Sequence, residues 1–156
     1  MNPVQEPVNG DQSLRGDNGA FNALVEFYQC FNHSDLPGLE GNWLSGDEPS
    51  MDNPIGGIRR GWEDIRAGYD KLFNGPARVT VEFYDYTQQQ GEDWSLFVGR
   101  ERGLCQVGEE ELHLAIRTTR WFVRRDLKWR QLHHHGSIEK PDLLASYQRL
   151  IFGAPL

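Results

Sequence analysis

Residues 112–138 read LHLAIRTTRWFVRRDLKWRQLHHHGSI, a stretch with strong strand signals. Its two parts, Leu112–Arg125 and Trp129–Ile138, are rich in the β-branched and aromatic residues that favour strands. The residues between them, Asp126-Leu127-Lys128, are typical of a hairpin turn. We therefore expect two long antiparallel strands, in which successive side chains point to opposite faces of a sheet.

The same pattern extends towards the N-terminus. Ala77–Thr87 and Trp94–Cys105 are again rich in Val, Phe, Tyr, Trp and Thr. Gly91-Glu92-Asp93 follows the first of them, and Gly108-Glu109-Glu110 separates the second from Leu112. Turn residues between strand-like runs indicate hairpins, so the sequence predicts a meander of four antiparallel strands.

Helical spacing of apolar residues appears on both sides of these strands. Before them we expect a helix that starts near Ala20 and ends at 32–35, a short helix from Leu36 to Leu44, a strand within 45–57, and a helix from about Gly61 to Phe73. After them we expect a helix over Pro141–Phe152. Helices grouped before an antiparallel sheet indicate the α+β class.

Composition and charge restrict the kind of protein. A chain of 156 residues has the length of one domain of about 100–200 residues. The net charge of −7 disfavours a nucleic-acid partner, because nucleic-acid binders carry basic surfaces. We find no signal peptide and no apolar run of about 18 residues, so we expect a cytoplasmic protein with no membrane partner.

The domain limits follow from local composition. Residues 1–17 are rich in Pro, Gly, Gln and Asn and lack periodicity, which predicts a disordered N-terminal lead-in. Residues 18–156 are then a single domain. Cys30 and Cys105 lie far apart in the sequence without a CxxC motif, and we expect two free thiols, with Cys30 buried.

Three local signatures, in this order, give the chain a family resemblance. They are Phe27–Asp35 at the end of the first helix, Asp52–Gly56 followed by Gly61 and Ile65, and Trp129–Ser137 in the last strand. Together they resemble the nuclear-transport-factor-2-like superfamily, and within it the SnoaL-like polyketide cyclase and ketosteroid isomerase branch. The resemblance covers residues 18–138. It implies a cone-shaped fold, in which helices pack on a strongly bent antiparallel sheet around one apolar pocket, and a homodimer formed through the outer sheet face.

The resemblance also allows a test of ketosteroid isomerase chemistry. In that isomerase an Asp directly before the Pro is the catalytic base, and this chain has Asn53 there. The first hydrogen-bond donor, a Tyr, falls at Phe27, with Tyr28 displaced by about 100° around the helix. The second donor, an Asp, falls at or near Thr119. An amide has no useful basicity at neutral pH, so we expect no authentic ketosteroid isomerase activity.

Other polar residues remain for the interior of the cone. Alternation places His133 and His135 on one face of the last strand, with Gln131, and places His134 on the other. We expect that face to line the pocket together with Arg117 and Thr119 of the neighbouring strand. His133 and His135 are then the candidate catalytic acid–base residues, because histidine titrates near neutral pH. The alternative is that these histidines only bond to the backbone.

The candidate ligand-binding set also includes aromatic residues. Tyr28, Trp43 and Trp62 would line the pocket, although aromatic residues at such spacing are more often part of the core. The full expected set is Asn53, Arg117, Thr119, His133, His135, Tyr28, Trp43 and Trp62.

We expect neither a metal nor a cofactor. His133-x-His135 followed by Glu139 imitates the first metal motif of cupins, but no histidine follows it. His113 would have to complete the site from another strand, and zinc also needs surrounding groups that hold its ligands. The resemblance therefore implies a domain that binds a small hydrophobic molecule, of the kind found in cyclases, isomerases and dehydratases acting on carbonyl compounds. The alternative is a non-catalytic dimerisation or protein-interaction module.

Overall fold

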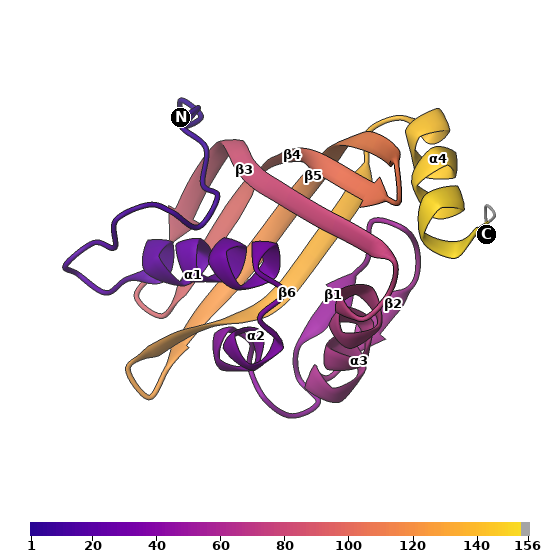
Figure 1. Ribbon diagram of the computed structural model, residues 1–156. Coiled ribbons are helices and arrows are strands. Elements are labelled where there is room, and N and C mark those ends of the chain that lie inside the picture. Colours follow the sequence, from indigo (N-terminus) through magenta and orange to yellow (C-terminus); the bar gives the residue numbers. More distant parts are fainter. Residues whose placement is uncertain (154–156) are drawn as a thin grey trace.

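The computed structural model describes residues 1–153, so positions 154–156 of the expected domain lie outside the described residues. The described chain forms four helices and six strands, which confirms the α+β class (Figure 1). In chain order these are α1 (Ala20–Asn32), α2 (Leu36–Asn42), β1 (Ser50–Asp52), β2 (Ile58–Arg60), α3 (Trp62–Phe73), β3 (Ala77–Gln90), β4 (Trp94–Val107), β5 (Glu110–Arg125), β6 (Lys128–Ile138) and α4 (Pro141–Phe152).

All six strands belong to one sheet, in the order β2-β1-β6-β5-β4-β3. The expected meander is confirmed, since β3, β4, β5 and β6 pair as consecutive antiparallel neighbours. The short hairpin of β1 and β2 extends the sheet, and β1 runs parallel to β6. Residues 50–52 and 133–135, far apart in the sequence, thus lie side by side.

Close strand contacts and β-bulges bend this sheet. At Gly103 in β4, an added Cβ atom would lie only 1.9 Å from the Thr80 carbonyl oxygen of β3. The register between β3 and β4 also shifts between Tyr84 and Thr87. Glycine within a strand and a bulge both mark places where a strand bends. The curled sheet that results partly encloses the helices (Figure 1).

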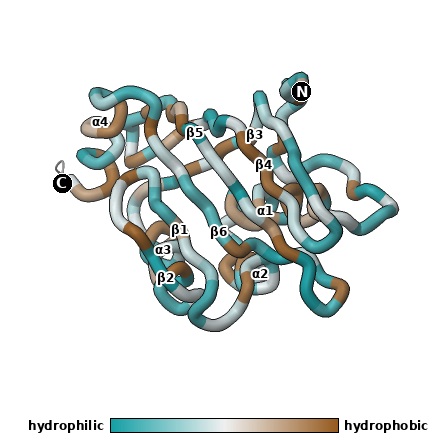
Figure 2. Tube along the Cα trace, turned by 180° about the vertical axis from the view of Figure 1, so that it is seen from behind, coloured by the Kyte–Doolittle hydropathy of each residue, from teal (hydrophilic) through white to brown (hydrophobic). Residues whose placement is uncertain are grey.

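The core lies between the inner face of the sheet and the helices. The largest side chains buried there include Phe27 and Tyr28 of α1, and Phe83, Phe97 and Phe122 of the long strands. Figure 2, seen from behind, shows hydrophilic and hydrophobic segments interspersed along β3–β6. Because successive side chains of a strand point to opposite faces, the inner face consists of the alternate positions that carry these apolar side chains.

A β-bulge in β6 changes which residues share a face. Trp121 of β5 pairs with His133, whereas the next residue, Phe122, pairs with Gln131, so that Leu132 is the extra residue. A bulge places an additional residue in one strand and shifts its alternation. Gln131 and His134 therefore both face the core, and both are buried. The expectation that Gln131 shares a face with His133 and His135 is therefore wrong.

The N-terminal residues do not match the expected disorder. Val4 and Val8 form bridges with Tyr86 and Phe83 of β3, and the backbone N–H groups of both valines donate bonds of 2.7 Å. Val8 is almost fully buried. An edge strand offers unpaired N–H and C=O groups, and these residues satisfy them while burying apolar surface. Residues 4–8 therefore cover part of the edge of β3.

A helix that crosses a membrane must be long and apolar. Among residues 1–153, no helix is sufficiently long and apolar to cross a membrane. The cytoplasmic location remains a prediction.

Candidate functional site

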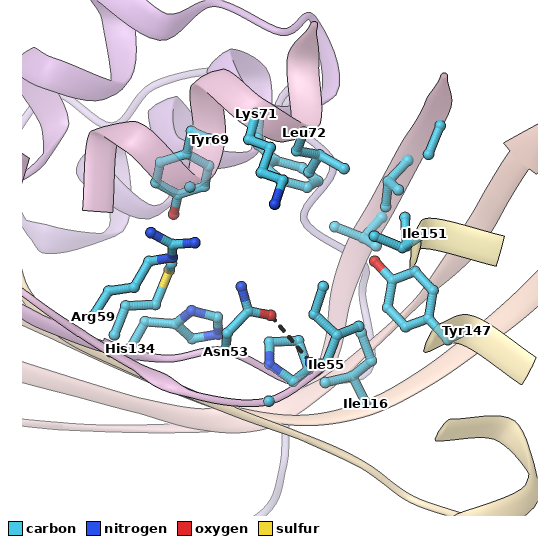
Figure 3. Close-up of a pocket in the computed structure, with 18 of the residues that line it drawn as sticks. Asn53, Ile55, Arg59, Tyr69, Lys71, Leu72, Ile116, His134, Tyr147 and Ile151 are labelled. Atoms are coloured by element: carbon cyan, nitrogen blue, oxygen red, sulfur yellow. Dashed lines mark hydrogen bonds between the residues drawn. The ribbon is translucent and has the colours of Figure 1, made fainter. Parts of the chain in front are cut away.

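A cavity of about 280 Å³ opens between the inner sheet face, α3 and α4. Figure 3 shows its walls: Tyr69, Lys71 and Leu72 come from α3, Tyr147 and Ile151 from α4, and Asn53 and Ile55 from the loop after β1. Most of the lining is apolar, including Ile116 of β5. A concave, mainly apolar site with few polar groups is the usual form of a small-molecule pocket.

His134 is a buried polar side chain of this wall whose hydrogen-bonding groups are unsatisfied. It is 5% exposed, and neither ring nitrogen has a hydrogen-bond partner among residues 1–153. Burial lowers its pKa well below the ordinary value, and the positive charge of Arg120 acts in the same direction. The ring is therefore neutral at pH 7, with one nitrogen as donor and the other as acceptor. Leaving buried polar groups unpaired costs about 1–3 kcal/mol each, so the site favours an occupant that bonds to this ring.

Beside His134 lies a buried ion pair. Arg120 is its cross-strand neighbour, and the Arg120 Nη2 atom lies 3.4 Å from the Glu101 Oε2 atom. Thr118 donates to the other oxygen of Glu101 at 2.6 Å. Both charged residues line the cavity and are nearly inaccessible to solvent. Their charges cancel, so the cavity floor carries no net charge.

Several neighbours hold the Arg120 guanidinium in place. It donates to the Tyr28 hydroxyl at 3.0 Å and to the Gln131 side-chain oxygen at 2.7 Å, and it lies 3.6 Å from the centre of the Phe27 ring. Gln131 in turn donates to Asn42 of α2. This network ties two helices to the sheet and fixes the polar part of the floor.

Two tyrosines complete the polar lining. Burial raises the pKa of Tyr69 to about 12 and raises that of Tyr147 still further above its ordinary value. Both phenols therefore keep their protons at neutral pH and can donate hydrogen bonds. At neutral pH this part of the lining consists of a neutral imidazole, two protonated phenols and an internal ion pair, a set suited to an uncharged polar group.

The rim of the cavity carries further donors. Asn53 uses its side-chain oxygen to accept from the Ile55 backbone N–H at 3.1 Å, so its NH2 group remains available (Figure 3). Lys71 points into the cavity from α3, and Arg59, which pairs with Asp64, lies on the same side as His134 (Figure 3). Oxygen atoms of a ligand would find donors at this rim.

The structure brings few of the expected site residues to this cavity. Asn53 lines it. Tyr28, Trp43 and Trp62 are buried in the core and are not among its lining residues. Tyr28 acts indirectly, through its bond to Arg120. These three aromatic residues are thus part of the core, which was the alternative to their lining the pocket.

The four remaining expected residues lie on the opposite face of the sheet. Thr119 pairs with His135, and Arg117 pairs with Ser137, and these pairs share the face of Trp121 and His133. Arg117, Thr119 and His135 border a shallow groove on that outer face. The expectation that these residues and His133 point into the cone is therefore wrong. In β5 the side chains that face the core are the alternate ones at Ile116, Thr118, Arg120 and Phe122.

Sequence reasoning missed His134, Arg120 and Glu101. One signal was available: Leu114, Ile116 and Phe122 are apolar and alternate in phase with Arg120, which indicates that Arg120 faces the core. No comparable signal existed for His134, because the bulge at Leu132 changes the alternation just before it.

Comparison with protein families gives one match over most of the chain. Residues 21–141 match the model described as a SnoaL-like domain. A comparison with curated proteins finds no match.

Solved structures share the fold at low sequence identity. A candidate dehydratase of the NTF2-like family from Streptomyces avermitilis has a TM-score of 0.71 and 19% identity, over 78% of this chain and 94% of that one. A ketosteroid isomerase-like protein from Erwinia carotovora atroseptica has a TM-score of 0.64 and 15% identity, over 76% and 92%. An uncharacterised protein with a cystatin-like fold from Caulobacter vibrioides has a TM-score of 0.65 and 17% identity, over 86% and 97%. At these identities the likeness concerns the fold alone.

Proposed function

Because the chain belongs to the family of SnoaL-like domains, we propose that its cavity binds a small, mainly apolar carbonyl compound. The carbonyl oxygen would accept a hydrogen bond from His134, and the apolar body would contact Ile116, Leu72 and Ile151. The observation that carries this proposal is the buried His134 ring with two unpaired nitrogens in an otherwise mainly apolar cavity.

The same arrangement suits a reaction in which a proton moves next to a carbonyl group. A neutral imidazole can accept a proton through one nitrogen, and nearby donors can stabilise the oxygen on which negative charge develops. Isomerisation, cyclisation and dehydration of carbonyl compounds all include such a step. Ketosteroid isomerase chemistry is not proposed, since the Asn53 amide cannot act as its base.

Binding can be tested with a matched pair of probes. 2-Tetralone and tetralin have the same bicyclic skeleton, and only the first has a carbonyl oxygen. We expect the protein to bind 2-tetralone about two- to tenfold more tightly than tetralin, which corresponds to one hydrogen bond of about 0.5–1.5 kcal/mol. His134→Leu should abolish this preference while tetralin binding persists. Calorimetric titration measures all four affinities.

Controls separate binding from folding and from chemistry. His113→Leu removes an exposed histidine from β5, away from the cavity lining, and should leave both affinities unchanged. Exchange of the α-protons of 2-tetralone in heavy water, followed by NMR, reports proton transfer above the uncatalysed rate. If neither probe binds, the cavity proposal fails. If 2-tetralone binds but exchanges at the uncatalysed rate, the binding proposal stands and the catalytic one fails.

Exposed apolar side chains favour a second candidate function, assembly through the outer sheet face. Trp94 and Val98 of β4 and Trp121 of β5 are 42%, 45% and 40% exposed, respectively. Pairing of Val98 with Thr119 and of Leu96 with Trp121 places these three side chains on the outer face. Contiguous exposed apolar surface often marks a protein interface. We therefore also propose a homodimer formed through this surface, which we call the outer patch.

A further inference from the structure

A second cluster of polar side chains lies on the outer face, where β1 meets β6. The two strands are parallel, and the register sets Ser50 beside His133 and Asp52 beside His135. Residues two positions apart in a strand point the same way. One carboxylate and two imidazoles are thus gathered on one surface, although 81 to 83 positions separate Asp52 from the histidines in the sequence.

The distances within this cluster are short. His135 Nδ1 lies 2.6 Å from the Asp52 carboxylate. One ligating atom from each of Asp52, His133 and His135 lies within 4.8 Å of the other two. A tetrahedral zinc site with bonds of about 2.1 Å holds its ligand atoms about 3.4 Å apart, so the side chains need to approach by at most about 1.4 Å. Rotation of exposed side chains provides a movement of that size; the His135 side chain is 53% exposed.

Ser50 adds the kind of support that metal-binding histidines require. Its hydroxyl oxygen lies 2.8 Å from His133 Nδ1, and this contact orients the ring. In the tautomer whose Nδ1–H donates to the Ser50 hydroxyl oxygen, Nε2 carries the lone pair that a metal ion needs. Groups that hold the second nitrogen of a ligating histidine typically strengthen metal binding by 10- to 100-fold.

We propose that Asp52, His133 and His135 bind a divalent transition-metal ion of the zinc class. Two neutral imidazoles and one carboxylate are a common ligand set for such ions. The third ligand comes from β1 and not from Glu139, which pairs with Arg100. Three protein ligands leave a coordination position for water. Because these residues face away from the cavity, this site is independent of the proposed carbonyl-binding function.

Calorimetric titration of the untagged, metal-stripped chain with Zn²⁺ tests the proposal. We expect one equivalent to bind. His133→Ala, His135→Ala and Asp52→Asn should each weaken binding by tenfold or more, and Ser50→Ala by about tenfold because it removes only the supporting contact. Binding should also weaken as the pH falls, since histidine ligands must be neutral. With Co²⁺ in place of Zn²⁺, the visible spectrum should be that of a four-coordinate, tetrahedral complex.

His113→Ala provides the matched control, because it removes another exposed histidine from the same sheet and should leave Zn²⁺ binding unchanged. The changed residues are at least partly exposed, and circular dichroism checks that each variant folds. Absence of binding overturns the proposal. So does binding that is insensitive to His133→Ala and His135→Ala, or weakened equally by His113→Ala. Unchanged affinity in Asp52→Asn overturns the three-ligand site.

Discussion

At the scale of single residues, the pair of Arg120 and Glu101 determines both stability and the character of the cavity. The two side chains are only 2% and 4% exposed. Removing one member of a buried pair leaves the other charge without compensation, which typically costs about 3–5 kcal/mol. We therefore expect Arg120→Met to lower the free energy of unfolding in urea by this amount.

The double variant Arg120→Met/Glu101→Gln should lose less stability than Arg120→Met alone, because no uncompensated charge remains. Arg125→Met is the surface control: Arg125 pairs with Glu48 where both side chains are half exposed, and the effect should be much smaller. Equal losses in Arg120→Met and Arg125→Met would show that burial of the pair is not the cause.

At the scale of elements, the bend of the sheet depends on the close approach of β3 and β4 at Gly103. A methyl group at this position would overlap the Thr80 carbonyl oxygen. Overpacking of a tight site typically costs 1–3 kcal/mol, and this contact is with rigid backbone. We expect Gly103→Ala to destabilise the protein by about 3 kcal/mol, measured by urea unfolding.

Gly41→Ala is the matched control, since nothing lies within 4 Å of an added Cβ atom there. Gly41 lies in α2, where alanine has the higher helix propensity, so stability should rise by about 0.5–1 kcal/mol. If Gly103→Ala were as stable as the original chain, the bend would not depend on this glycine.

At the scale of the whole molecule, the outer patch carries the proposed assembly. Trp121 pairs with Leu96, which lies between Trp94 and Val98 in β4. We expect the protein to sediment as a dimer and Trp121→Asp to sediment as a monomer, because the substitution places charge in an apolar interface.

Leu127→Asp is the control for this experiment. Leu127 is 86% exposed at the tip of the β5–β6 hairpin, outside the outer patch, and its replacement should leave the dimer intact. A monomer at all concentrations, or a dimer that persists in Trp121→Asp, would contradict assembly through this surface.

Most of the fold was predictable because it depends on local patterns. Helical spacing in Ala20–Phe31 and alternation in residues 112–138 both follow from which side chains must be buried. The N-terminal segment was missed since its pairing with β3 is a long-range contact of a sequence without periodicity. The site was harder still, because only Asn53 of the expected residues lines the cavity.

The sequence by itself determined the α+β class, the four-strand meander, the family resemblance and the grouping of His133 with His135. The apolar alternation of β5 indicates its inner face, but only the tertiary structure decided which residues of β6 share that face, and it brought Asp52 of β1 beside His135. The physical reason is that alternation fixes which side chains point together, whereas the direction in space depends on where the helices pack. One additional residue at Leu132 was enough to turn His134, and not its neighbours, into the cavity.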